Sequence, residues 1–249
     1  VQPLDAVTSV LGLGLIGIVL GYTFRRKTSP ATTIFWGSVA SLVSKIAILG
    51  LGMVTLGVNP LASMPDVMEK AVSQALDIYR GLGAPEQVLE QMKSQLQPVV
   101  KMMPIVIPAS LLLAAVVDTF LNFLIAKTVL QKLGNPVASF PPFKDWVLPR
   151  WILYLYALAI LMIYHGDKEQ IELLYKAGLN LQILSTTMLL IQGLSVFYFL
   201  ADKYNLSRPQ RGIILMMTFV IPVFSSIAVF AGAFELALDY RKLRTARSK

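Results

Sequence analysis

The stretch MMPIVIPASLLLAAVVDTFLNFLIA, residues 102–126, decides the fold class, because it is long, almost wholly apolar and interrupted by one acid. A helix of this length extends about 37 Å, more than the roughly 30 Å of hydrocarbon in a bilayer. Five similar apolar stretches occupy residues 6–24, 34–57, 147–165, 179–200 and 212–236. Because lipid offers the backbone no hydrogen-bond partners, each stretch should be a helix. The sequence therefore predicts an all-α, polytopic transmembrane bundle with about six spans.

The composition of the whole chain supports a membrane protein. Its 249 residues are 55% hydrophobic and only 14% charged, whereas soluble domains have about 25% charged residues. This excludes soluble enzymes, nucleic-acid-binding modules and disulfide-stabilised secreted domains. The chain has no Cys and its one His is His165, so we expect neither a metal site nor a cofactor. The sequence begins at Val1 rather than Met, and we expect further residues to precede it.

The basic residues predict which loops face the cytoplasm, because cytoplasmic loops carry an excess of Lys and Arg. The net charge of +8 therefore reports topology rather than nucleic-acid binding. The predicted cytoplasmic loops are 25–27, 127–150 and 203–211, and the predicted outward loops are 58–101 and 166–178. The tail, 241–249, is also basic, yet six alternating spans would place it outside. A re-entrant segment at 147–165 would correct the tail but would move 203–211 outside, so both arrangements stay open.

The loop 58–101 carries a helical pattern of its own. Met68, Val72, Leu76 and Tyr79 form one apolar stripe at helical spacing. Gly81 and Gly83 interrupt the stripe, and Pro85 suits the first turn of a second helix. We therefore predict an extracytoplasmic amphipathic helical hairpin inserted between spans two and three of a single membrane domain, 1–249. It could be a fixed cap on the bundle or a mobile lid hinged at Gly81 and Gly83.

Two ionisable residues lie deep inside predicted spans. Lys45 and Asp118 lie about 11 and 9 residues from the cytoplasmic ends of their spans, roughly 16 and 14 Å deep, so the two side chains can meet. A charge at this depth is costly unless it is paired or hydrated. Asn122 lies one turn from Asp118 on the same face. The residues form either a structural pair or the lining of a polar cavity that binds a small solute or carries protons.

Polar and small residues in other spans complete the candidate sites. Asn180, Gln182 and Gln192 of the fifth span could join the solute site or hydrogen-bond to neighbouring helices. In the first span, three glycines share one face and favour close helix packing within the bundle or at a subunit interface. These glycines are Gly14, Gly17 and Gly21. No catalytic motif such as HExxH, GxSxG or a P-loop occurs, and we expect no enzymatic activity.

Several stretches together resemble the YybS-like family of bacterial multi-pass membrane proteins. They are Asp118–Gly134, the stretch PPFKDWVLPR at 141–150, NLQIL at 180–184, IQGLS at 191–195 and DYRK at 239–242. The family is remotely similar in fold to the substrate-binding S-components of energy-coupling-factor transporters. The resemblance implies a location in the bacterial cytoplasmic membrane and no assigned activity.

The expected function follows from these features together. We expect S-component-like binding or transport of a small solute, at a site between spans two, three and five beneath the hairpin. The alternative is a non-transporting scaffold for cell-envelope assembly or a membrane complex. The expected partners are the lipid bilayer, a small-molecule solute and other membrane subunits, with no nucleic acid.

Overall fold

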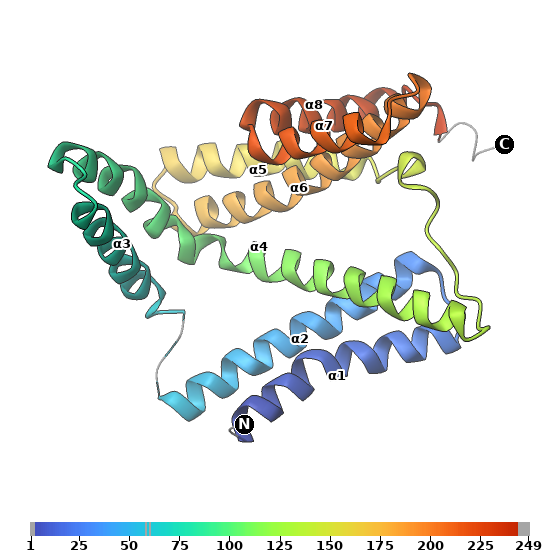
Figure 1. The fold of residues 1–249 in the computed structure, drawn as a ribbon, viewed down its shortest axis with the longest axis horizontal. Helices are drawn as coiled ribbons and strands as arrows, with labels where there is room; N and C mark the ends of the chain where they lie inside the picture. Colours follow the sequence, from blue (N-terminus) through green and yellow to red (C-terminus); the bar gives the residue numbers. More distant parts are fainter. Residues whose placement is uncertain (1–2, 58, 60, 244–249) are drawn as a thin grey trace. The chain divides into compact units, whose positions relative to one another are not determined.

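The computed structural model describes residues 3–57, 59 and 61–243, and among them it contains eight α-helices, one short 3-10 helix and no strand (Figure 1). The helical class predicted from the apolar stretches is confirmed. The chain divides into two compact units, residues 1–138 and 139–249. Each unit is described by itself below.

The first unit contains α1 (Pro3–Arg25), α2 (Pro30–Leu56), α3 (Met64–Gly81) and α4 (Glu86–Lys132). Ser29 caps the start of helix α2, because its side chain accepts a hydrogen bond from the Thr32 amide, 3.1 Å away. Pro30 occupies the first turn, where its missing N–H costs nothing. Helix α2 packs against both α1 and α4 (Figure 1).

Helix α4 is 47 residues long and joins the second arm of the predicted hairpin to the third predicted span. The sequence predicts these as two separate segments, but the helix passes through Pro98, Pro104 and Pro108 without a break. Each proline removes one backbone donor and favours a bend. In Figure 1, α4 changes direction between the part beside α3 and the part beside α2.

The predicted helical hairpin is present as α3 and the first turns of α4. Leu76 of α3 and Leu89 of α4 are buried where the two arms contact each other, whereas Tyr79 of the predicted stripe is exposed. Between the arms, the Ala84 amide donates to the Tyr79 carbonyl and the Gly83 amide donates to the Arg80 carbonyl, which is the helix-ending arrangement that favours glycine. Gly83 has φ +87°, as this turn requires. The outward placement of the hairpin stays a prediction.

The second unit contains η1 (Phe143–Asp145), α5 (Trp151–Lys168), α6 (Glu172–Lys203), α7 (Arg208–Val220) and α8 (Pro222–Leu238). Glycines allow its helices to approach closely. A Cβ at Gly193 of α6 would collide with the carbonyl oxygen of Ala228, and one at Gly232 of α8 would collide with that of Leu189. Leu189 also packs with Ile152 and Leu236 in a small apolar core.

The predicted span at 212–236 is not a single straight helix. Helices α7 and α8 meet at a bend of 102°, because Ile221 is extended and Pro222 begins α8. Proline disfavours a helical conformation at the residue before it, which explains the break.

Three described helices are long and apolar enough to cross a bilayer, and the bent α7–α8 pair would raise that number to four. The three are Pro30–Thr55, Glu86–Lys132 and Glu172–Lys203. A shorter apolar helix lies at Gly14–Arg25. The structure therefore supports several spans, whereas the predicted count of six is not confirmed.

Candidate functional site

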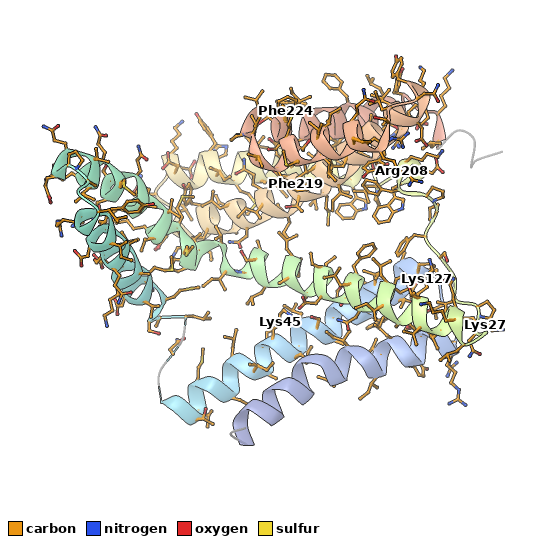
Figure 2. The ribbon with its side chains drawn as sticks, in the orientation of Figure 1. Lys27, Lys45, Lys127, Arg208, Phe219 and Phe224 are labelled. Atoms are coloured by element: carbon orange, nitrogen blue, oxygen red, sulfur yellow. The ribbon has the colours of Figure 1, made fainter. Side chains whose placement is uncertain are left out.

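Lys45 of α2 and Asp118 of α4 form an ion pair, as their similar depths predict. The Lys45 ammonium also donates to the Ser41 hydroxyl, one turn earlier in α2, at 3.2 Å. The pair is not enclosed within its unit, since 24% of the Lys45 side chain and 44% of the Asp118 side chain are exposed. In Figure 2, Lys45 lies in the middle part of α2. The pair is therefore a charged feature with one open face.

A polar seam on α2 positions this pair. Thr33, Ser41 and Ser44 are almost completely buried, and between them Gly37 lies so close to Thr119 of α4 that a Cβ would collide with its methyl group. Small residues at a spacing of four allow two helices to approach closely. Thr33, Gly37 and Ser41 have this spacing in the sequence. The predicted close packing, however, is at the glycines of the first span.

Two hydroxyls, one in α2 and one in α4, are buried and have no hydrogen-bond partner among the described residues. They are the side-chain oxygens of Ser38 and Thr119. A buried hydroxyl without a partner costs roughly 1–3 kcal/mol, so ordered water is the usual solution at such positions. Thr119 adjoins Asp118 in the sequence and packs against Gly37 of α2, so one of the two hydroxyls is beside a member of the charged pair in the sequence.

Asn122 is tied to its own helix. Its side-chain amide donates to the Asp118 carbonyl at 2.8 Å, which fixes the amide one turn from the carboxylate. The sequence prediction that Asp118 and Asn122 share a face is confirmed. The structure thus brings together Lys45, Asp118 and Asn122 in the first unit.

The three candidates of the fifth predicted span belong to α6 in the second unit. The Asn180 amide donates to the Lys176 carbonyl at 2.8 Å, and Gln182 lines an open groove with Tyr164 and Tyr175. Gln192 is fully buried and holds the loop before α5, accepting from the Leu148 amide at 2.8 Å. Gln192 therefore has a structural partner inside its own unit.

The second unit also contains a buried ion pair that was not predicted from the sequence. Arg241 Nε donates to Glu235 Oε1 at 2.8 Å, and the two side chains are 0% and 2% exposed. The other guanidinium nitrogens donate to the carbonyls of Lys144 and Trp146, at 2.5 and 2.9 Å, and to the Ser195 hydroxyl at 2.9 Å. Glu235 is an acid within an apolar run, which is the same signal that identified Asp118.

Hydrogen bonds of this network hold the loop before α5 against α6, α8 and Arg241. The Ser195 hydroxyl donates to the Phe143 carbonyl at 2.7 Å, and Arg150 Nε donates to the Leu236 carbonyl at 3.2 Å. Nearby, Lys144 pairs with Asp202 at 2.8 Å. The hydrogen bond and the charge of Asp202 raise the pKa of the Lys144 amine above its usual value. The stretch PPFKDWVLPR thus docks onto α6 and the C-terminal segment.

The glycines predicted to act in packing and hinging are placed as follows. A Cβ at Gly17 or Gly21 would meet no described atom within 4 Å, and both lie on an exposed face of α1, whereas Gly14 is half-buried. Within the described part of this unit, the close approach occurs at Gly37 instead. Gly81 is the last residue of α3 and Gly83 makes the turn, so their role as hinges stays a prediction.

Metal-binding groups do not gather in the described part of the chain. No cluster of three or more His, Cys, Asp or Glu side chains that could hold an ion occurs there. The chemistry available at Lys45 and Asp118 is instead that of a cation and an anion side by side, which can bind polar groups or exchange protons.

Comparisons with known proteins agree with a membrane location. A family model described as a predicted membrane protein, DUF2232, matches residues 1–236. The chain is 26% identical over 231 residues to the uncharacterized protein YybS of Bacillus subtilis, covering 90% of this chain and 72% of that protein. No solved structure matches the chain. The predicted resemblance to YybS is confirmed, and the chain belongs to the DUF2232 family of predicted membrane proteins.

Proposed function

We propose that this multi-pass protein binds a small polar solute at the Lys45–Asp118 pair and helps to move it across a bacterial cytoplasmic membrane. The observation that carries the proposal is the open face of the pair, with 44% of the Asp118 side chain exposed within a long apolar helix. On this proposal the protein is a binder and does no chemistry on its solute.

The depth of the pair makes exposure to lipid costly. Lys45 lies about 11 residues before the end of α2 at Leu56, roughly 16 Å along the axis, and Asp118 lies about 14 residues, roughly 21 Å, before the end of α4. Both positions are far from either end of their helices. Charged groups at such depth almost always face a bundle interior or a water-filled cavity. We therefore place solute or water, rather than lipid, against Asp118.

The chemistry of the pair suggests the class of solute. Asp118 would accept hydrogen bonds from an amine or hydroxyl, and Lys45 would bind a carboxylate or another anionic group. A zwitterion or a polyhydroxylated compound satisfies both groups together. The buried hydroxyl of Thr119, beside Asp118 in the sequence, adds capacity to hold water near the pair. The hairpin would act as the lid of this site.

Small molecules that co-purify with the protein test this proposal. The wild type, Asp118→Asn and the control Asp66→Asn would be purified in parallel, and their bound compounds would be identified by mass spectrometry. Asp66 is an exposed acid of the hairpin. We expect one compound on the wild type and the control, reduced about tenfold or more by Asp118→Asn, since a hydrogen bond to a charged group contributes about 1.5–3 kcal/mol. The same compounds in equal amounts on all three proteins would refute it.

A scaffold is the second candidate, because Gly17 and Gly21 form a small-residue face with no described atom within 4 Å of a Cβ. Such a face fits a helix of another subunit in a membrane complex. Disulfide cross-linking of Gly17→Cys in native membranes would detect a second copy there. Unchanged co-purified compounds in Asp118→Asn, together with efficient cross-linking, would place the scaffold first.

A further inference from the structure

Both ends of the α7–α8 pair lie at the same end of the second unit. At the start of α7, Arg211 Nη1 donates to Asp202 Oδ1 of α6 at 2.5 Å. Asp202 also pairs with Lys144, and the carbonyl of Lys144 accepts from Arg241, three residues after α8. The segment between Arg211 and Arg241 therefore begins and ends beside the same pair of residues, Asp202 and Lys144.

The length of each helix agrees with a segment that does not cross the bilayer. Helix α7 has 13 residues and α8 has 17, about 20 and 26 Å respectively, both shorter than roughly 30 Å of hydrocarbon. A straight helix over residues 212–236 would be long enough, but the 102° bend at Ile221 and Pro222 prevents it.

The surface of the pair is apolar away from its two ends. From Gly212 to Phe234 the sequence has no ionisable residue, and large side chains there are more than half exposed. These side chains include Ile213, Phe219, Val220, Val223, Ile227 and Phe230. Figure 2 shows Phe219 and Phe224 near the bend and Arg208 at the opposite end of α7.

We infer that α7 and α8 form a re-entrant hairpin that enters the bilayer from the cytoplasmic side, carries its bend into the hydrocarbon and returns to the same side. Hydrocarbon is the occupant that fits the exposed face, since that face consists mainly of large apolar side chains and has ionisable residues only toward its two ends. The basic residues of 203–211 then share one side with Arg241 and Lys242, so the start of the basic tail no longer conflicts with the positions of the other basic loops.

Cysteine labelling tests this inference in the full chain, which has no native Cys. Single variants Asn205→Cys, Lys242→Cys and Val220→Cys would be exposed to a membrane-impermeant maleimide in intact cells and in inverted vesicles. We expect Asn205→Cys and Lys242→Cys to be labelled only in inverted vesicles, and Val220→Cys in neither until detergent is added. Labelling of the first two from opposite sides would mean a broken full span and would overturn the inference.

A depth measurement identifies what covers the bend. An environment-sensitive fluorophore on Phe219→Cys, in vesicles of phosphatidylcholine brominated in mid-chain, should be quenched several-fold more than one on Lys242→Cys. Maleimide access to Val220→Cys from water would indicate a hairpin lying on the surface. Lack of both access and quenching would indicate cover by protein. Either outcome would overturn the assignment to hydrocarbon, and elution as a single species would check that each variant is folded.

Discussion

Replacement of Arg241 by Met should destabilise the second unit severely, because the guanidinium serves Glu235, Ser195 and the carbonyls of Lys144 and Trp146 at once. Met keeps an unbranched apolar side chain in the same space but removes every donor. The Glu235 carboxylate is 2% exposed and its Oε2 already has no partner among the described residues. After the substitution, Oε1 would also lose the hydrogen bond that Arg241 supplies.

The size of the effect follows from the burial of the pair. Loss of one member of a buried ion pair costs about 3–5 kcal/mol, because the other charge stays buried and uncompensated. For a chain of this size, 1 kcal/mol corresponds to about 2–4 °C in Tm. We therefore expect Arg241→Met to lower the Tm by roughly 6–20 °C.

Thermal unfolding of the detergent-solubilised protein, followed by size-exclusion chromatography, measures this shift. The matched control is Lys242→Met, which changes the exposed neighbour and should alter stability by less than about 0.5 kcal/mol. The double variant Glu235→Leu/Arg241→Met removes both charges and should recover much of the loss. If Arg241→Met unfolds like the control, or if the double variant is less stable than the single one, the reasoning is wrong.

Three further predictions concern the other contacts. A double-mutant cycle of Lys45→Met and Asp118→Asn should give a coupling energy of roughly 0.5–3 kcal/mol in thermal unfolding, whereas strictly additive losses would show that the pair contributes nothing. Gly193→Ala should prevent close packing of α6 on α8 and lower the folded yield. The control Gly212→Ala has open space around its Cβ and should leave the yield unchanged. Equal yields of the two variants would contradict the packing. If the hairpin is a lid, hydrogen exchange in 61–97 should be faster than in the ends of α2 and should slow with the co-purified solute, whereas a fixed cap would exchange slowly throughout.

The pairing of Lys45 with Asp118 could be predicted from sequence because charge and depth are both properties of a single helix. Each residue interrupts an apolar run, and their depths can be compared with no knowledge of packing. The hairpin could be predicted for a similar reason. Its helical stripes, the Gly83 turn and the Pro85 start are all local signals, and the structure ends α3 at Gly81 and begins α4 at Glu86.

The Arg241 network could not be predicted in the same way. Its members come from the loop before α5, from α6, from α8 and from the segment after α8, and residues separated by up to 97 positions meet there. Glu235 interrupts an apolar run as Asp118 does, but hydropathy assigns Arg241 to a basic tail and gives no information on which carbonyls lie near it. Only tertiary packing brings them together.

The bend between α7 and α8 could not be predicted from the sequence, for a different reason. Residues 212–236 have the length and hydropathy of a span, and proline inside a membrane helix is often tolerated. Hydropathy cannot distinguish a kinked helix from two helices at 102°. This ambiguity limits any count of spans that rests on hydropathy alone.

Access of water to the Asp118 face tests the central claim most directly. Asn122→Cys places a thiol on that face, and Leu121→Cys places one on an exposed apolar face of α4. In intact membranes, a water-soluble cationic methanethiosulfonate should modify Asn122→Cys about tenfold or more faster than Leu121→Cys, because the reactive thiolate forms only where water reaches the sulfur. Equal and negligible modification of both thiols would show that the Lys45–Asp118 pair is sealed from water, and would contradict a solute site there.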